Sequence, residues 1–394
     1  MNYIFVLGST QLTQAELTTV LQRIEPLSQI EFLDDVAIVN TDSELNSSQL
    51  IKLLGGTIKI AKITASISEI TPDSIAQILF KQAPHAQVFG ISVYNSSTNF
   101  NLNLPEIKQI LSEKGMRTRY IEAKEGNSLS SVVVVKQKVT EVIMVFDTTK
   151  KLWWVGITQA VQDFEDWGSR DFGRPAADAR SGMLPPKVAR ILVNLAFPEA
   201  YSGEQLTLLD PFCGVGTILA EAMLLGWKVI GIDQSENAVA NTRKNLSWLT
   251  QKYPETADRK YMLHVGDATH THQLLGQEKI DAIATEPFLG SPFIKKGTDI
   301  WQKDQPVTTA RIKNVVKGLE KLYIGVLREW QPLLKTGSKV VITLPEFAIG
   351  GKTFFVKKVV DMCENLGYTL SQGPYTYARP QAIVKRNIYV LQKS

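Results

Sequence analysis

The 394-residue sequence has few cysteines, few histidines and no long apolar segment, and each scarcity excludes a class of protein. Cys213 and Cys363 are its two cysteines, too few for a disulfide framework or a four-cysteine zinc site. His270 and His272 are two residues apart, but no third ligand follows at a suitable spacing, so we expect no metal. No stretch approaches the ~20 apolar residues of a membrane span, so we expect no membrane insertion.

The remaining composition is that of an ordinary globular protein, with 44% hydrophobic and 21% charged residues. The length suits two or three domains. Residues 1–8 form an apolar run without a basic start or a cleavage site, so they predict a first strand rather than a signal peptide, and we expect a cytoplasmic protein. The net charge of +4 suits a nucleic-acid partner without demanding one.

The N-terminal half predicts two α+β domains. In residues 1–70, apolar runs at Tyr3–Leu7, Ile30–Val39 and Ile58–Ser66 predict strands separated by helices. In residues 71–160, helices and strands alternate again, and the β-branched segment Ser131–Lys136 predicts a strand. We therefore expect an α+β N-terminal half.

The C-terminal half predicts a different architecture. Residues 161–179 belong to an irregular stretch rich in Asp, Arg, Gly and Pro, which predicts a linker. From residue 180 to residue 394, strands and helices alternate, including a predicted helix at Thr353–Leu366, and two strands close the chain. This order predicts an α/β, doubly wound domain with an antiparallel pair at its end.

A glycine-rich turn after the first strand of this half is the strongest local signal. Residues 210–217 (DPFCGVGT) follow a strand and open a helix, where glycines let the backbone approach a ligand closely. Asp233 follows the next strand and Asp267 the third, so three acids end consecutive strands, an arrangement that fits an adenosine ligand. Aspartate is also favoured at helix N-caps, which is the alternative explanation. The turn lacks the final glycine of a dinucleotide fingerprint, which argues against NAD. It also lacks the Lys-Ser/Thr pair of a P-loop, which excludes that motif.

This segment closely resembles the cofactor motif of Rossmann-like methyltransferases that modify RNA amino groups. Upstream, residues 170–175 (RDFGRP) and 180–187 (RSGMLPPK) resemble the segment that precedes the core in THUMP-containing tRNA guanine-N2 methyltransferases. The archaeal and eukaryotic members that act on guanosine ten are the nearest match. The resemblance implies S-adenosylmethionine as cofactor. It assigns cofactor contacts to Met183, Leu184, Pro185, Lys187, Asp210, Phe212, Cys213, Gly214, Gly216, Thr217, Asp233, Gln234, Asp267 and Ala268.

The resemblance extends more weakly to the N-terminal half. Residues 89–94 (FGISVY) and 129–133 (LSSVV) resemble the ferredoxin-like and THUMP pair that such enzymes use to hold tRNA. We therefore expect residues 1–70 to be ferredoxin-like and residues 71–160 to be THUMP-like. Basic residues of the second segment are candidates for phosphate contacts, although a solvated surface is an equally simple explanation: Lys108, Arg117, Arg119, Lys124 and Lys136.

The fourth strand of the C-terminal half ends in residues 285–290 (TEPFLG), where the family places Asp-Pro-Pro-Tyr or a related sequence. Strict alignment puts Thr285 in the place of the acid and Glu286 in that of the first proline. We expect the catalytic residues to be Thr285, Glu286, Pro287 and Phe288. Glu286 should supply the carboxylate, the carbonyl of Glu286 or Thr285 should be a second acceptor, and Phe288 should stack on the base. The alternative is a degenerate site.

Taken together, these patterns predict methyl transfer to an exocyclic amine of RNA, with guanine N2 of tRNA as the first choice. A DNA amino-methyltransferase shares the glycine and acid motifs, and a catalytically degenerate RNA-binding protein is consistent with the altered catalytic motif. We expect a monomer with tRNA as partner. The resemblance leaves open a small activator subunit, which eukaryotic relatives use.

Overall fold

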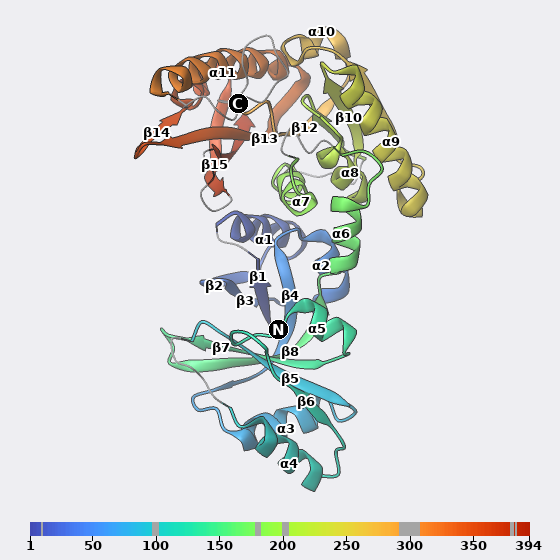
Figure 1. The fold of residues 1–394 in the computed structure, drawn as a ribbon, viewed down its shortest axis with the longest axis vertical. Helices are drawn as coiled ribbons and strands as arrows, with labels where there is room; N and C mark the ends of the chain where they lie inside the picture. The colour runs from blue at the N-terminus through green and yellow to red at the C-terminus, as the bar shows by residue number, and fades with distance from the viewer. Residues whose placement is uncertain are drawn as a thin grey trace. The chain divides into compact units, whose positions relative to one another are not determined.

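The computed structural model describes residues 1–8, 11–96, 102–177, 183–198, 205–290, 308–378, 382 and 384–394. The chain forms two compact units, Met1–Gly168 (unit 1) and Ser169–Ser394 (unit 2), shown in Figure 1. The division between them lies within helix α6 (Phe164–Phe172). Each unit has its own sheet.

Unit 1 contains one eight-stranded sheet. Its strands are β1 (Asn2–Leu7), β2 (Gln29–Leu33), β3 (Val36–Asn40), β4 (Thr57–Ile67), β5 (Val88–Tyr94), β6 (Arg119–Ile121), β7 (Thr140–Asp147) and β8 (Leu152–Val161). They follow the order β2-β3-β1-β4-β8-β7-β5-β6. Its helices are α1 (Gln11–Ile24), α2 (Ser47–Leu53), α3 (Pro72–Gln82), α4 (Leu104–Glu113) and α5 (Ser131–Lys136). Because β4 pairs with β8, strands from both predicted N-terminal domains share this sheet.

Two predicted elements of unit 1 are wrong. Segment 30–39 is a hairpin of β2 and β3 rather than one strand, because Asp34 adopts a left-handed conformation (φ 51°), which aspartate tolerates in turns. Ser131–Lys136 is the helix α5 and not a strand. The Ser130 hydroxyl accepts the N–H of Val133 at its start, and Val134 is buried in a small apolar cluster. Capping and packing here outweigh the strand preference of four valines.

Unit 2 contains the predicted doubly wound sheet. Its strands are β9 (Thr207–Asp210), β10 (Lys228–Asp233), β11 (Tyr261–Val265), β12 (Ile280–Thr285), β13 (Leu334–Ile349), β14 (Lys352–Phe355), β15 (Tyr368–Tyr377) and β16 (Val384–Lys393). Seven of them follow the order β11-β10-β9-β12-β13-β16-β15, and β14 pairs with β13. Strands β11 to β13 of this order are parallel, whereas β16 and β15 are antiparallel to their neighbours. The α/β fold class is confirmed.

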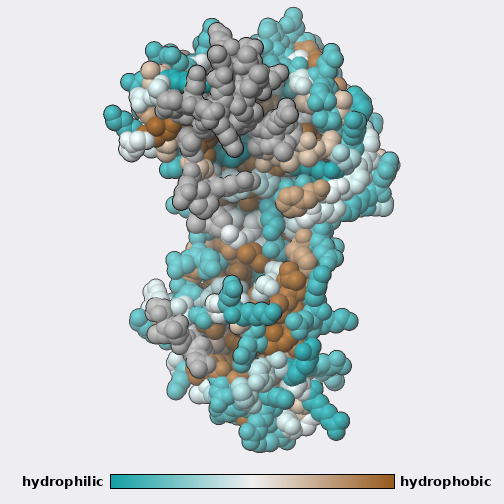
Figure 2. Space-filling view, in the orientation of Figure 1, coloured by the Kyte–Doolittle hydropathy of each residue, from teal (hydrophilic) through white to brown (hydrophobic). Residues whose placement is uncertain are grey.

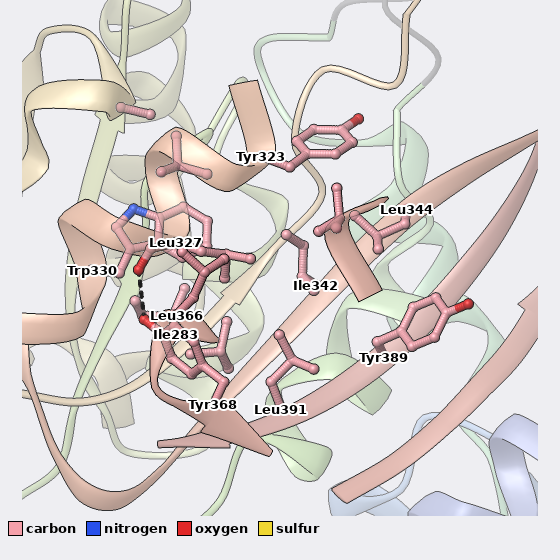
Figure 3. Close-up of a cluster of buried hydrophobic side chains, with 14 of the residues drawn as sticks. Ile283, Tyr323, Leu327, Trp330, Ile342, Leu344, Leu366, Tyr368, Tyr389 and Leu391 are labelled. Carbon is pink, nitrogen blue, oxygen red and sulfur yellow. Dashed lines mark hydrogen bonds between the residues drawn. The ribbon is translucent and has the colours of Figure 1, made fainter. Parts of the chain in front are cut away.

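Helices cover both faces of the sheet of unit 2 (Figure 1). They are α7 (Pro186–Leu195), α8 (Thr217–Leu224), α9 (Glu236–Lys252), α10 (Thr271–Leu275), α11 (Thr309–Trp330) and α12 (Lys357–Asp361). On one face, Tyr323, Leu327 and Trp330 of α11 pack with Ile283 of β12 and Ile342 of β13, as Figure 3 shows. These side chains recur on one side of α11, which is why this long segment is a helix on a sheet.

The position of the candidate site follows from the point at which the strand order of the sheet reverses. After β9 the chain proceeds to β10 and β11 on one side, and β12 and β13 lie on the other side. The carboxyl ends of β9 and β12 therefore meet at a switch point, the usual place for a ligand in open α/β sheets.

One further prediction is wrong in unit 2. Segment 353–366 is not one helix, because Lys352–Phe355 pairs with β13 as β14 and α12 covers five residues. The predicted linker 161–179 contains the helix α6, whose first N–H groups, those of Glu165 and Asp166, donate to the Asp163 carboxylate. The finer division into domains at residues 70 and 180 stays a prediction.

Candidate active site

The glycine turn between β9 and α8 has the geometry that its sequence predicts. Gly214 and Gly216 have φ angles of 53° and 83°, a region that other residues rarely adopt. A Cβ on Gly216 would lie 2.7 Å from Cγ2 of Thr242, so this glycine is also required by packing. A Cβ on Gly214 would meet no heavy atom of the described residues within 4 Å. On this side of Gly214 the described residues therefore leave space for a ligand.

Side chains of α9 hold this turn from behind. The Thr242 hydroxyl donates to the carbonyl of Gly214 (2.7 Å), and the Asn245 amide donates to the carbonyl of Val215 (2.8 Å). Asn245 also exchanges two hydrogen bonds with the backbone of Ala176, at 2.9 Å each. The turn is thereby fixed to α9 and to the segment that precedes α7.

Asp233 connects the glycine turn to the next strand end. Its Oδ2 accepts the N–H of Gly214 (3.0 Å), and its Oδ1 accepts the N–H of Ser235 (2.9 Å). A carboxylate oxygen has two lone pairs, so each oxygen keeps one for a further donor. A compound with neighbouring hydroxyl groups matches this pair of acceptors.

Asp267 follows β11 and lies at the start of the short helix η2 (Ala268–His270). It accepts the N–H and the hydroxyl of Thr269, both at 2.8 Å, and these bonds lower the pKa of its carboxyl group. Asp267 is exposed, Ala268 is buried, and Gln234 beside Asp233 is exposed. The N-cap role that the sequence left as an alternative is thus present at Asp267.

Asp210 lies at the switch point and is fully enclosed. Its Oδ1 accepts the hydroxyl of Thr285 (2.7 Å) and the N–H of Phe212 (3.2 Å). Burial raises the pKa of Asp210 to about 7, and these two hydrogen bonds oppose the rise. Thr285 is itself buried, with its hydroxyl directed at Asp210. The hydroxyl of Thr285 therefore joins β12 to β9.

Glu286 is the first residue after β12, and it forms a bidentate ion pair with Arg386 of β16. Arg386 Nε donates to Oε2 at 2.6 Å and Nη2 donates to Oε1 at 3.1 Å. The side chain of Glu286 is 14% exposed and that of Arg386 is 21% exposed. Burial raises the pKa of Glu286, whereas the hydrogen bonds and the charge of Arg386 oppose that rise.

The next residues present an aromatic ring on a fixed backbone. The Tyr323 hydroxyl of α11 donates to the carbonyl of Phe288 (2.7 Å), and Gly290 packs closely against Val315 and Leu319 of the same helix. The Phe288 side chain is nevertheless 57% exposed. An exposed ring on a held backbone suits stacking on a flat ligand.

The segment before α7 contacts the same turn. Arg174 donates to the hydroxyl of Thr217 (2.5 Å), the first residue of α8, and its Nη2 lies 3.2 Å from Sδ of Met183. Leu184 is buried, and burial lowers the pKa of Lys187. Pro185 is the N-cap residue of α7. Arg174 thus links this predicted cofactor segment to the glycine turn.

Cys213 is buried within the turn, and its Sγ lies 3.9 Å from the Thr242 hydroxyl. Burial raises the pKa of its thiol well above the ordinary value, so the thiol stays protonated and is a poor nucleophile. No group of His, Cys, Asp or Glu side chains suited to a metal occurs among the residues that the structure describes.

The predicted RNA contacts of unit 1 lie at its surface. Lys108, Arg117, Arg119 and Lys124 are exposed, and Figure 2 shows hydrophilic side chains over much of the visible face of this unit. Lys136 is exposed too, but it pairs with Glu165 (3.1 Å) and lies over the ring of Phe164. No described helix is long and apolar enough to cross a membrane.

The sequence did not single out Arg174, Thr242, Asn245, Tyr323 or Arg386 as site residues. Arg174 lies inside the RDFGRP segment, which did carry a signal. Arg386 follows Glu286 by 100 residues, and no local pattern connects the two.

Comparisons with known proteins find similarity to methyltransferases. The profile of the UPF0020 family, described as an RMKL-like methyltransferase domain, matches residues 174–291. A Pyrococcus abyssi protein named tRNA (guanine(10)-N2)-dimethyltransferase is 34% identical over 142 residues, which cover 35% of this chain and 38% of that protein. A Methanothermococcus thermolithotrophicus protein named probable tRNA (guanine(10)-N2)-dimethyltransferase is 30% identical over 143 residues, 34% of this chain and 85% of that protein.

The matched segments span 38%, 31% and 28% of the first three curated relatives, about a third of their length. The crystal structure of TrmN from Thermus thermophilus superimposes on the whole chain with a TM-score of 0.57 and 15% identity, covering 100% of both chains. At that identity the likeness concerns the fold alone.

Proposed function

Because this chain belongs to the family of methyltransferases that includes the archaeal proteins named tRNA (guanine(10)-N2)-dimethyltransferase, we propose that it methylates an exocyclic base amine of RNA. The substrate that we propose is N2 of guanine in tRNA, and the methyl donor is S-adenosylmethionine. The names of the relatives and the resemblance of the sequence motifs support this choice.

The observation that carries the proposal is the edge formed by the glycine turn and Asp233. The described residues leave space beside Gly214, and each oxygen of Asp233 accepts one N–H and retains a lone pair. These features fit the adenosyl and amino-acid parts of S-adenosylmethionine, whose ribose presents two hydroxyl groups. When bound, this cofactor supplies a methyl group activated by a positively charged sulfur. Asp233 would hold the ribose, and the turn together with residues 183–187 would enclose the rest.

The residues after β12 would hold the base. Glu286 accepts hydrogen bonds from the exocyclic amine and so orients the nitrogen lone pair, with a backbone carbonyl of residue 285 or 286 as the second acceptor. It also accepts the proton that the nitrogen loses. Phe288 stacks on the base, which must leave its own stack to reach this site. Most of the rate then comes from alignment, since the methyl group needs no strong base.

Unit 1 would hold the tRNA. Its exposed cations Lys108, Arg117, Arg119 and Lys124 are candidates for phosphate contacts, whereas Lys136 is already paired. We assign it the ferredoxin-like and THUMP-like roles that the sequence resemblance implies. We expect the protein to act as a monomer in the cytoplasm.

The test is methyl transfer from labelled S-adenosylmethionine with three substrates: unmodified tRNA, duplex DNA and tRNA that already carries N2-methylguanosine at position ten. We expect incorporation into the first substrate, and mass spectrometry should find N2-methylguanosine. Incorporation into duplex DNA alone would establish the DNA amino-methyltransferase instead. Cofactor binding by calorimetry without transfer to any RNA would indicate a degenerate RNA-binding protein, and absence of both would reject the whole assignment.

A further inference from the structure

We propose that Arg386 is the positioning residue of this site, which holds the Glu286 carboxylate in the orientation and charge state needed to accept hydrogen bonds from the base amine. The inference rests on the proposed function and adds to it a residue from a distant part of the chain. Arg386 acts through Glu286 and is not assigned any contact with the base.

The geometry of the pair supports an orienting role. Two donors of one planar guanidinium reach both oxygens of one carboxylate, at 2.6 and 3.1 Å. A bidentate pair of this kind fixes the plane of the carboxylate as well as its position. Each oxygen then retains a lone pair, so Glu286 is held and still able to accept further N–H donors.

The strand that carries Arg386 is a rigid support. On β16, Arg386 stands opposite Pro345 of β13 and Tyr377 of β15, so its backbone lies between two hydrogen-bonded neighbours. Glu286 itself lies just beyond the end of β12, where the backbone has left the sheet. A glutamate has three rotatable side-chain bonds, and a partner anchored in the sheet restricts them.

The charges around the pair indicate that Arg386 stabilises the ionised form of Glu286. Asp210 of β9 carries the same charge as Glu286 when ionised, and it acts on the same region. Among the described residues, Tyr323 of α11 and Tyr377 of β15 also interact electrostatically with the pair, and neither is a cation at any pH. Lys385, next to Arg386 on β16, pairs instead with Glu346 of β13 at 3.3 Å. Arg386 is therefore the cation that the described structure supplies to Glu286.

Lys385 offers a matched control. It is the chain neighbour of Arg386, it belongs to the same strand, and it also forms an ion pair with a glutamate. Because successive side chains of a strand point to opposite faces, Lys385→Met removes a similar pair without changing Glu286.

The experiment compares the full-length wild type with Arg386→Met, Arg386→Lys and Lys385→Met. One readout is the titration of Glu286 by NMR of protein labelled with ¹³C at glutamate carboxyl groups, the signal being assigned by its loss in Glu286→Gln. The other is the pH profile of kcat for methyl transfer to tRNA. Folding of each variant is checked by thermal unfolding.

For Arg386→Met we expect the Glu286 signal to titrate about 1–3 pH units higher, because an opposite charge in contact lowers a carboxyl pKa by that amount. The acid side of the kcat profile should move upward with it, since transfer requires the ionised form. At high pH, kcat should stay roughly 10²-fold below wild type, because the carboxylate is no longer aligned. Arg386→Lys should restore the titration but not the full kcat, since lysine keeps the charge and loses the fork.

The proposal is overturned if Arg386→Met leaves both the titration and the profile at their wild-type positions, or if Lys385→Met moves them equally. The same experiment distinguishes a failure of this proposal from a failure of the proposed function. If the wild type transfers no methyl group while the titration shifts in Arg386→Met, Arg386 does control Glu286 and the assigned reaction is wrong. If the wild type is active and neither readout shifts, the reaction stands and Arg386 is not its positioning residue.

Discussion

Glu141 in unit 1 and Glu286 in unit 2 are both carboxylates paired with a cation inside the fold, but they differ in how completely they are satisfied. Glu141 and its partner Lys59 are 0% and 2% exposed. Ser92 and Thr158 also donate to Glu141, and Lys59 donates a further hydrogen bond to the carbonyl of Leu129. Glu286 and Arg386 are 14% and 21% exposed, and Glu286 lies just beyond the carboxyl end of β12.

The difference separates a structural ion pair from a candidate functional one. Glu141 receives donors from three strands, β4, β5 and β8, while it belongs to a fourth, β7. The Glu141 side chain is closed to solvent, and its hydrogen bonds connect neighbouring strands. Among the residues that the structure describes, Arg386 is the hydrogen-bond partner of Glu286, and Glu286 lies at the carboxyl end of β12 and is partly exposed, so it retains acceptor capacity for a ligand. The number of hydrogen-bond donors and the exposure of the carboxylate, rather than its charge alone, distinguish the structural pair from the candidate functional one.

The largest effect that we predict is the loss of stability in Glu141→Gln. This change leaves the Lys59 ammonium buried without its counter-charge, which typically costs about 3–5 kcal/mol. Urea unfolding of the full chain, monitored for unit 1, measures it. Glu44→Gln is the control, because the Glu44–Lys62 pair lies on the surface of the same unit, and it should barely change the midpoint. Equal midpoints for the two variants would show that the buried pair contributes no more to stability than the surface pair.

The same substitution at Glu286 should act on activity instead. Glu286→Gln removes the proposed acceptor of the amine proton, so methyl transfer should fall by roughly 10²-fold or more. Its unfolding midpoint should change less than that of Glu141→Gln, because water reaches Arg386 and partly hydrates it. Initial rates at saturating tRNA and cofactor, together with urea unfolding, test both parts. A variant with unchanged rates would assign Glu286 to structure.

Asp210 extends the comparison to a buried carboxylate with no cation partner in the described part of the chain. Its folded-state pKa of about 7 lies above the ordinary 3.8, so folding favours the protonated form. The stabilisation is therefore complete below about pH 4 and is lost as the pH rises through 7. Between pH 5 and pH 7 the wild type should lose about 2 kcal/mol of stability.

The measurement is urea unfolding of unit 2 at several pH values in the wild type and Asp210→Asn. The variant should lack this loss, because asparagine keeps an acceptor for Thr285 and Phe212 and does not ionise. Asp258→Asn, at an exposed position of the same unit, should retain the wild-type pH dependence. If the curves of wild type and Asp210→Asn run parallel, the enclosed state of Asp210 is wrong.

The smallest effects should come from exposed cations for which the described residues provide no ion-pair partner. In the double variant Arg117→Gln with Arg119→Gln, tRNA affinity should fall several-fold, and the salt slope of binding should decrease by about 1 per lost phosphate contact. Lys136→Gln should change the slope less, because Lys136 already pairs with Glu165. Filter binding at four salt concentrations measures the slopes, and unchanged slopes in the double variant would exclude this surface from RNA contact.

Local patterns predicted much of the molecule. Alternating elements after residue 180 predicted the doubly wound sheet, because strands buried on both faces leave continuous apolar runs between amphipathic helices. Asp210 and Asp233 were predicted at strand ends, and the structure places both there. Ser131–Lys136 was predicted as a strand and is a helix, since a cap and one buried valine decide a six-residue segment.

The sequence by itself determined the glycine turn, the acids that follow the parallel strands and the aromatic residue after β12, because each depends on neighbours within a few residues. Only the tertiary structure decided the partners of the buried charges. Lys59 meets Glu141 across 82 residues and Arg386 meets Glu286 across 100, through strand pairings that no local pattern encodes. Sheet registers bring such side chains together, and a register is a property of the whole fold.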